Sequence, residues 1–404
     1  MSKILVLNIT LPYPANYNGN TIRVFPLSKE LSREHDCFLA VFDDDQVRLE
    51  ALKQTHVYNE ILVLPGNTDG YSPLRHIFYK TGGSFKRSAP GYYAKIVSLL
   101  SDYIEKNSID FIIAHTLSAS EFVLPFTNIP KLIDDIDCKT LSVQRRIKYQ
   151  GQPANLKARL KNHIELIRAR YQESSLTKYF DFVTTISPID RKVLSDLNEG
   201  ADNRIFDIPN GFLPELLDYE VPVKQISRSI AFWGALDFPP NSSAVQYFFE
   251  NVYKPYLSDK GVDWYIIGRN ASEDIVRMSE EFDNIKVTGF VDDLFGLVSQ
   301  IPIMINPMQM GGGLKNKVLE AFALGRLVIS NEMGIEAVPA DKNRHYVGAN
   351  TPKEFSDAIL RYLDDAKSAK AIGLDAQKYV RANYNWHALG QRFNKLIKSV
   401  PSSD

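Results

Sequence analysis

The chain has 404 residues, which is too long for one compact core and suits two domains. Its 44% hydrophobic and 24% charged residues exclude a disordered, collagen-like or coiled-coil chain. With 47 Lys and Arg against 48 Asp and Glu, the net charge of −1 argues against a general nucleic-acid binder. The two cysteines, Cys37 and Cys138, exclude a disulfide framework and favour a reducing, cytoplasmic compartment.

Short apolar runs alternate with longer helical patterns for almost the whole length. Most runs are continuously apolar, which is typical of parallel strands that helices cover on both faces. They are too many for one open sheet, so we predict an α/β fold with two doubly wound, Rossmann-like domains. The predicted strands are Lys3–Asn8, Asp36–Phe42, Glu60–Pro65, Asp110–His115, Lys131–Asp135, Phe182–Ile186, Ile205–Pro209, Ser229–Trp233, Trp264–Ile267, Asn284–Val287, Pro302–Asn306, Leu327–Ser330 and His345–Val347.

The segment after Pro209 has little periodicity and contains prolines, as a linker between domains should. It favours an N-terminal domain over residues 1–209 and a C-terminal domain over residues 210–385. The last pattern, Trp386–Lys398 within residues 386–404, predicts an amphipathic helix that either domain could hold.

No run approaches the roughly 18 apolar residues that a membrane-spanning helix needs, and the N-terminus favours a first strand over a signal peptide. Any membrane contact is therefore expected to be peripheral. The stretch Lys139–Lys178 carries ten Lys and Arg against two Glu, and Tyr71–Lys95 adds five more basic residues. A solvated helix face and a surface for an anionic partner, such as a phospholipid face or a pyrophosphate-linked acceptor, both fit this pattern.

The clearest binding motif is GGGLKNKVLEAFALG, Gly311–Gly325, which follows the strand ending at Asn306. Three glycines allow the backbone to approach a ligand, and a helix start offers amides to a diphosphate. Lys317 and Glu320 are three residues apart and share one helix face. A flexible turn before an ordinary helix is the alternative, but the preceding strand and the Lys–Glu face favour ligand binding.

Further polar residues follow strands at the edge where open parallel sheets bind ligands. The first loop, Tyr13–Arg23, contains Gly19. The run FIIAH ends in His115, and Arg269 follows the run WYIIG. The run KLIDDID ends in aspartates that could bind a ligand or cap the next helix. The histidines are scattered and the metal-binding motif HExxH does not occur, so we expect no metal and no cofactor. The nucleophile turn GxSxG does not occur either. The aspartates of the run KLIDDID are Asp134, Asp135 and Asp137.

From Lys3 to Trp386 the chain resembles the family-4 retaining glycosyltransferases of GT-B architecture, close to the bacterial polysaccharide sugar transferases. The matching blocks include FIIAH, LIDDID, FDFVTTISPID, IPNGF, SIAFWGALDFPPN, YIIGRN, VTGFVDDL and GGGLKNKVLEAFALGRLVIS. The last two in succession are the most specific. The resemblance implies an N-terminal acceptor domain and a C-terminal donor domain facing across a cleft, with the last helix crossing back to the first domain.

The resemblance also implies roles for single residues. Glu320 would take the donor ribose hydroxyls, Val291 would flank the nucleobase, Gly19 would lie beside the diphosphate and His115 would contact the transferred sugar. Asp137 is a candidate to orient the acceptor. The residues predicted to bind the donor are Gly19, Arg23, Gly234, Arg269, Val291, Gly312, Gly313, Leu314, Lys317 and Glu320, and those predicted to be catalytic are His115 and Asp137.

The chain departs from the family at two places. The usual pair of Glu residues eight positions apart is incomplete, because Gly312 occupies the place before Glu320. The usual Arg and Lys in the first turn of the donor domain are also missing after Gly234. Because two phosphates need compensating charge, we hypothesise that Lys317 and Arg269 replace this pair.

The predicted activity is transfer of a sugar from a nucleoside diphosphate sugar to a hydroxyl of a glycan or lipid-linked acceptor, with retention of anomeric configuration. Charge on the departing diphosphate would be stabilised by fixed cations and glycine amides. A nucleotide-sugar epimerase of similar fold and a catalytically silent nucleotide-binding subunit are the alternatives. The sequence does not indicate the base, the sugar or the acceptor.

Overall fold

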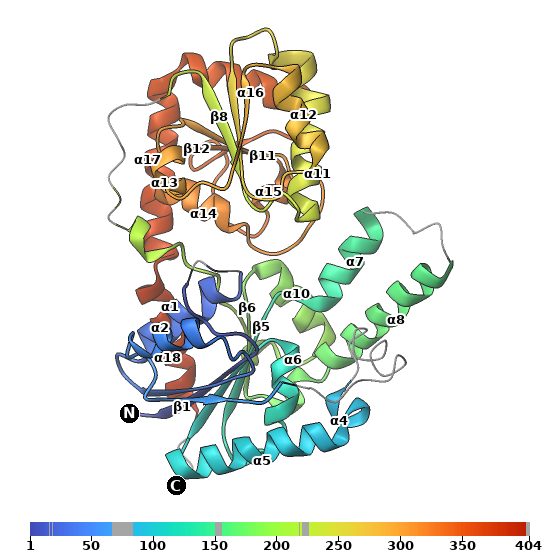
Figure 1. The fold of residues 1–404 in the computed structure, drawn as a ribbon, viewed down its shortest axis with the longest axis vertical. Helices are drawn as coiled ribbons and strands as arrows, with labels where there is room; N and C mark the ends of the chain where they lie inside the picture. Colours follow the sequence, from blue (N-terminus) through green and yellow to red (C-terminus); the bar gives the residue numbers. More distant parts are fainter. Residues whose placement is uncertain are drawn as a thin grey trace. The chain divides into compact units, whose positions relative to one another are not determined.

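The computed structural model describes residues 1–15, 17, 19–66, 84–149, 156–217, 219 and 226–400. The chain divides into two compact units, which are coloured along the sequence in Figure 1. Unit 1 comprises Met1–Gly211 and Trp386–Asp404, and unit 2 comprises Phe212–Asn385. Each unit is built on one parallel sheet with helices packed against it, so the predicted α/β class with two Rossmann-like domains is confirmed.

Unit 1 contains a seven-stranded parallel sheet in the order β3-β2-β1-β4-β5-β6-β7. Its strands are β1 (Lys3–Asn8), β2 (Asp36–Val41), β3 (Glu60–Val63), β4 (Phe111–His115), β5 (Lys131–Ile136), β6 (Phe182–Thr185) and β7 (Ile205–Asp207). Its helices are α1 (Thr21–Leu31), α2 (Gln46–Lys53), α4 (Phe85–Ser88), α5 (Pro90–Asn107), α6 (Leu117–Ser120), α7 (Lys139–Tyr149), α8 (Leu156–Glu173), α9 (Leu176–Tyr179), α10 (Pro188–Leu197) and α18 (Trp386–Ser399), with 3₁₀ turns η1 (Glu121–Val123) and η2 (Asp202–Arg204).

Unit 2 contains a six-stranded parallel sheet in the order β10-β9-β8-β11-β12-β13. Its strands are β8 (Ser229–Trp233), β9 (Asp263–Ile267), β10 (Ile285–Gly289), β11 (Ile303–Asn306), β12 (Leu327–Ser330) and β13 (Val347–Gly348). Its helices are α11 (Pro239–Phe248), α12 (Glu273–Glu281), α13 (Leu294–Val298), α14 (Asn316–Ala323), α15 (Glu332–Ile335), α16 (Pro352–Asp364) and α17 (Ala366–Asn383), with the 3₁₀ turn η3 (Pro214–Leu216) and the π-helical η4 (Phe249–Leu257).

The continuous apolar runs form strands because both faces of each sheet are buried. In β1, Leu5 and Leu7 belong to one core cluster, while Ile4 and Val6 belong to the cluster on the opposite face. Since successive side chains of a strand point to opposite faces, a sheet covered on both sides needs apolar residues at every position. The predicted strands therefore match the observed ones within a few residues at each end.

The closing helix α18 lies in unit 1, beside α1 (Figure 1). Its apolar face packs through Trp386, Leu389 and Phe393 into the core cluster that also contains Val24 of α1. The chain leaves the first part of unit 1 at Gly211, where a Cβ would lie 2.7 Å from the ring of Trp386. Only glycine permits this close approach.

Each sheet changes winding direction at one point. In unit 1 the strands β1 and β4 are neighbours, and in unit 2 the neighbours at this point are β8 and β11. Open α/β sheets bind ligands beyond the carboxyl ends of the strands at such switch points. Among the described residues, no helix is long and apolar enough to cross a membrane.

Candidate functional site

The glycine-rich loop of unit 2 lies at its switch point, between the end of β11 and the start of α14. Gly311 and Gly313 have φ angles of +103° and +66°, which L-residues with side chains rarely adopt. A Cβ on Gly311 would lie 3.4 Å from Pro240, in the first turn of α11. The predicted strand, glycine turn and helix are therefore present, and the loop approaches the helix that follows β8.

Lys317 lies in the first turn of α14 and reaches the loop after β8. Its Nζ donates to Asn241 Oδ1 at 2.7 Å and lies 3.8 Å from the centre of the Phe232 ring. Gly234 is adjacent, because a Cβ built on it would be 3.2 Å from the same Nζ. Burial lowers the pKa of Lys317 to about 7, although the charge of Glu320 opposes this shift. A bound anion would therefore stabilise the protonated, charged form of Lys317.

Glu320 stands one turn further along α14. Its Oε2 accepts a hydrogen bond from the indole nitrogen of Trp233 at 2.8 Å, and no donor among the described residues contacts Oε1. Burial raises the pKa of Glu320, whereas the Trp233 bond and the charge of Lys317 lower it. One carboxylate oxygen is held by the protein, and the other is available to a hydroxyl group.

The structure brings together Gly234, Lys317 and Glu320, together with partners that the sequence did not point to. Trp233 and Phe232 resemble core residues in the sequence because they belong to a buried apolar strand. Asn241 follows two prolines and resembles an ordinary residue at a helix start. No spacing rule pairs Asn241 with Lys317, 76 positions later.

The remaining predicted donor residues occupy the same sheet edge in different ways. Arg269 is exposed beyond β9, and its carbonyl accepts from the backbone nitrogen of Leu236 at 3.0 Å. Val291 is half-buried beyond β10, and Gly312 is half-buried in the glycine-rich loop, while Leu314 is buried next to it. No hydrogen bond links Arg269 to Lys317 within the described part of unit 2.

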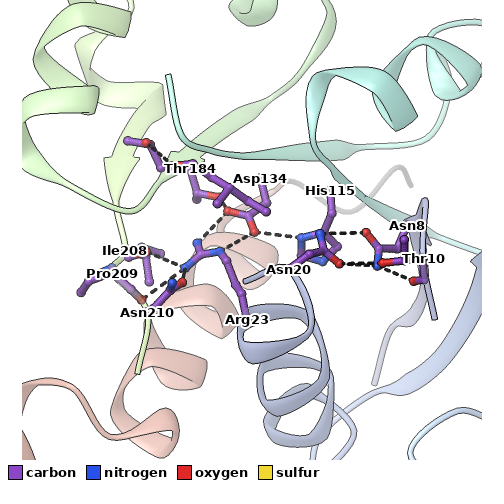
Figure 2. Close-up of polar contacts among 12 residues, drawn as sticks. Asn8, Thr10, Asn20, Arg23, His115, Asp134, Thr184, Ile208, Pro209 and Asn210 are labelled. Carbon is purple, nitrogen blue, oxygen red and sulfur yellow. Dashed lines mark hydrogen bonds and ion pairs between the residues drawn. The ribbon is translucent and has the colours of Figure 1, made fainter. Parts of the chain in front are cut away.

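In unit 1, Arg23 and Asp134 form a fully buried ion pair (Figure 2). Arg23 binds both Asp134 oxygens at 2.6 Å through Nε and Nη2. Its Nη1 donates to the carbonyls of Ile208 and Pro209 and to Asn210 Oδ1. The Arg23 side chain has no exposed surface in this structure and binds groups of its own unit, and its predicted contact with the donor stays a prediction.

The same carboxylate orients His115 at the end of β4. His115 Nδ1 lies 2.8 Å from Asp134 Oδ2 (Figure 2). Burial alone would raise the pKa of Asp134, but the charge of Arg23 and the hydrogen bond from His115 hold it well below its usual range. Because Asp134 is ionised, Nδ1 carries the proton, and the buried Nε2 has no partner within the described residues.

The first loop of unit 1 is tied to the end of β1. Asn8 and Asn20 exchange side-chain hydrogen bonds of 2.8 and 3.2 Å, and Asn8 also donates to the carbonyl of Thr10 (Figure 2). Gly19 is exposed, with open space around the position of a Cβ. Asp137 is exposed beyond β5. These placements leave the predicted roles of Gly19 and Asp137 as predictions.

The start of the basic helix α7 is bound by a carboxylate of α8. Glu173 of α8 accepts from the backbone nitrogens of Lys139 and Thr140 at the start of α7. No group of three or more His, Cys, Asp or Glu that could hold a metal ion occurs in the described ranges. The predicted absence of a metal and a cofactor remains a prediction.

Asp135 lies in a buried group of carboxyls with Glu173 and Asp190. Its Oδ2 is buried and has no hydrogen-bond partner among the described residues. Burial first, and then the neighbouring negative charges, raise its pKa well above the usual range. Burial also raises the pKa of Asp190 to about 6. Asp135 therefore remains protonated at pH values where an exposed aspartate is ionised.

Asp135→Asn is expected to raise the free energy of unfolding at pH 8 by about 1–3 kcal/mol and to change it little at pH 4. The raised pKa means that the folded protein holds the proton more tightly than the unfolded chain. The stability linked to this proton is complete below the unfolded pKa and is lost as pH rises through the folded pKa. Asparagine imitates the protonated acid at every pH.

Urea unfolding of the variant and the parent chain at both pH values measures this difference. Asp196→Asn serves as the control, because Asp196 is exposed on α10 and forms only a surface ion pair with Lys192. An equal loss of stability at pH 4 and pH 8 for Asp135→Asn would show that stability is not linked to a proton on Asp135 and would contradict the raised pKa.

Comparisons with known proteins concern the fold and unit 2. Residues 227–365, which lie within unit 2, match the family described as Glycosyl transferases group 1. Sucrose-phosphate synthase from Thermosynechococcus elongatus superposes with a TM-score of 0.68 at 15% identity, over 98% of both chains. Anabaena HepE in complex with UDP and glucose has a TM-score of 0.67 at 15% identity, over 99% of this chain and 100% of HepE. The fold is GT-B.

Two proteins with similar sequences add to this comparison. A Klebsiella pneumoniae protein described as an uncharacterized 44.6 kDa protein in the cps region is 23% identical over 95% of this chain and 97% of its own length. An uncharacterized glycosyltransferase of Methanocaldococcus jannaschii is 25% identical over 37% of this chain and 42% of its own length. The family match in unit 2 and the GT-B fold together support a glycosyltransferase.

Proposed function

We propose that this GT-B protein transfers a sugar from a nucleoside diphosphate sugar to a hydroxyl of a glycan or lipid-linked acceptor, with retention of anomeric configuration. The observation that carries the proposal is the grouping of the glycine-rich loop, Lys317 and Glu320 at the switch point of unit 2. The loop and Lys317 suit a diphosphate, and Glu320 Oε1 suits a ribose hydroxyl. The solved structures of HepE with UDP and glucose make UDP the first nucleotide to test.

In the proposed reaction, the bond between the anomeric carbon and the diphosphate oxygen breaks, and its electron pair leaves with the diphosphate. The acceptor oxygen bonds to the anomeric carbon on the same face, and its proton passes to an oxygen of the diphosphate. Lys317 and the glycine-loop amides stabilise the negative charge as it develops, and Arg269 beyond β9 adds a second cation. Charge compensation then comes from fixed groups of the protein. A role in polysaccharide synthesis belongs to the same proposal, supported by the cps region named for the Klebsiella relative.

The test is incubation with nucleotide sugars after a thermal-shift screen of UDP, GDP and their sugars, since a ligand held by the native state raises the melting temperature. Transfer to an acceptor and an unchanged anomeric configuration in the product, measured by NMR, are the expected results. Conversion of the donor to an epimer without an acceptor would instead establish an epimerase. Nucleotide binding without any turnover would establish a binding subunit.

His115→Asn is expected to lower turnover by about ten- to a hundredfold, with little change in nucleoside diphosphate affinity. The reason is that the proposed role of His115 is to position the transferred sugar, whereas the nucleotide binds in unit 2. Steady-state kinetics and calorimetry with the nucleoside diphosphate separate the two effects. His56→Asn is the control, because His56 is exposed and has a φ of 54°, which asparagine tolerates. Unchanged turnover of His115→Asn would remove His115 from the proposed mechanism.

A further inference from the structure

The helix α8 carries a row of large apolar side chains on its exposed side. Leu156, Leu160, Ile167 and Tyr171 are 79%, 58%, 54% and 74% exposed. Their spacing of four, seven and four residues puts them on one face of an α-helix, because 3.6 residues complete a turn. This set is called the α8 apolar stripe below. An apolar face of this length normally packs into a core.

The opposite face of α8 carries its two acidic residues inward. Glu165 is buried and pairs with Lys139 and Arg146 of the neighbouring helix α7. Glu173 is fully buried and accepts backbone N–H groups at the start of α7. Both carboxylates of α8 therefore face neighbouring elements, while the α8 apolar stripe is exposed.

Basic side chains border the α8 apolar stripe on both sides. On a helical projection, Arg159 and Arg170 lie on one side of the stripe, and Lys157 and Lys161 lie on the other. All four are exposed, whereas both carboxylates of α8 are turned inward. The outer surface of α8 thus carries the four apolar side chains along its middle, with the exposed His163 between Leu160 and Ile167, and cations along both margins.

We propose that the α8 apolar stripe binds the surface of an anionic phospholipid bilayer. A helix that lies in the interface needs an apolar face that enters the boundary between headgroups and acyl chains, and cations beside it that meet lipid phosphates. Long Lys and Arg side chains can extend from such a helix to the headgroups, and a tyrosine at its end suits the interface. The sequence alone left open a solvated basic face, and the exposed apolar row favours a surface for an anionic bilayer.

The bilayer fits this surface better than a second copy of the chain does. Two such faces in contact would bring together cationic margins of the same sign, which is unfavourable. An anionic bilayer instead offers negative charge along both margins and an apolar layer beneath them. This binding does not depend on the proposed sugar transfer.

Co-sedimentation of the full chain with vesicles tests the proposal. We expect binding to vesicles of phosphatidylcholine with phosphatidylglycerol and much weaker binding to phosphatidylcholine alone. Leu160→Ser combined with Ile167→Ser should weaken binding by about tenfold or more, because it removes apolar side chains from the interface. Lys161→Gln combined with Arg170→Gln should weaken binding by roughly thirtyfold, the effect of two lost cations near the surface.

Two matched double variants serve as controls. Val47→Ser with Leu374→Ser removes two exposed apolar residues from α2 and α17, and Lys367→Gln with Lys370→Gln removes two exposed cations from α17. Both should bind vesicles as the parent chain does. Circular dichroism and the unchanged affinity for a nucleoside diphosphate verify that each variant is folded, independently of activity.

Absence of binding to anionic vesicles would overturn the proposal, as would equal loss of binding in the control variants. Light scattering provides a separate check on the occupant of the surface. A concentration-dependent dimer of the parent chain that Leu160→Ser with Ile167→Ser abolishes would assign the α8 apolar stripe to a second copy and overturn the bilayer assignment. A monomer that binds anionic vesicles supports it.

Discussion

Lys317→Ala is expected to weaken binding of a nucleoside diphosphate by roughly ten- to a hundredfold, equivalent to about 1.5–3 kcal/mol for a hydrogen bond to a charged group. The Lys317 ammonium lies between Asn241 and the Phe232 ring and next to Gly234, in the loop after β8. An anion bound beside the glycine-rich loop would be a negatively charged partner for this ammonium. Isothermal calorimetry with UDP and GDP measures the loss.

The effect should depend on pH in a defined direction. Because burial lowers the pKa of Lys317 to about 7, the free protein loses this charge as pH rises above 7. A bound diphosphate restores the charge, so binding at pH 8 should take up a proton and affinity should fall between pH 7 and pH 9. Calorimetry in buffers of different ionisation enthalpy detects the proton.

The melting temperature distinguishes weaker binding by Lys317→Ala from a loss of folding. The lowered pKa of Lys317 means that the unfolded chain binds the proton more tightly, so this lysine lowers stability at neutral pH. Lys317→Ala should therefore retain its melting temperature, and Lys370→Ala, an exposed lysine of α17, is the control for binding. If Lys317→Ala binds nucleoside diphosphates as tightly as the parent chain, the diphosphate lies elsewhere and the proposed function loses its main support.

Arg23→Met is expected to lower the free energy of unfolding by about 3–5 kcal/mol, because it leaves the Asp134 carboxylate buried without its partner. The carbonyls of Ile208 and Pro209 also lose a donor. Urea unfolding followed by circular dichroism measures the change.

A double-mutant cycle separates the ion pair from the other contacts of Arg23. Asp134→Asn alone should also destabilise the protein, since it removes the charge that Arg23 and His115 contact. The double variant, Arg23→Met with Asp134→Asn, should lose less stability than the sum of the single losses. Additive losses would mean that the two side chains contribute independently, and Arg23 would then not serve to hold Asp134 ionised.

Much of the fold could be predicted because strands that are buried on both faces consist mainly of apolar residues. The runs at Lys3–Asn8, Ser229–Trp233 and Leu327–Ser330 have the predicted bounds, since each is buried on both faces and ends where polar or glycine residues begin. The strand predicted at His345–Val347 instead lies at Val347–Gly348. It is an edge strand of two residues, and so short a pairing leaves a weak pattern.

The candidate site of unit 2 could be predicted in part for a related reason. A glycine triplet after a strand and before a helix is a local pattern, and Lys317 and Glu320 lie within two turns of it. Asn241 in the first turn of α11 and Trp233 at the end of β8 hold these two side chains, and both contacts form only when the strands pair. Their roles depend on contacts between distant segments.

The sequence by itself determined the two parallel-sheet units, their strand ends and the glycine-rich turn, because each depends on residues that are neighbours along the chain. The tertiary structure alone decided that Arg23 pairs with Asp134, 111 positions away, inside unit 1. It also decided that the apolar side of α8 faces outward. Helical periodicity defines which residues share a face, but the neighbouring elements determine which face is covered.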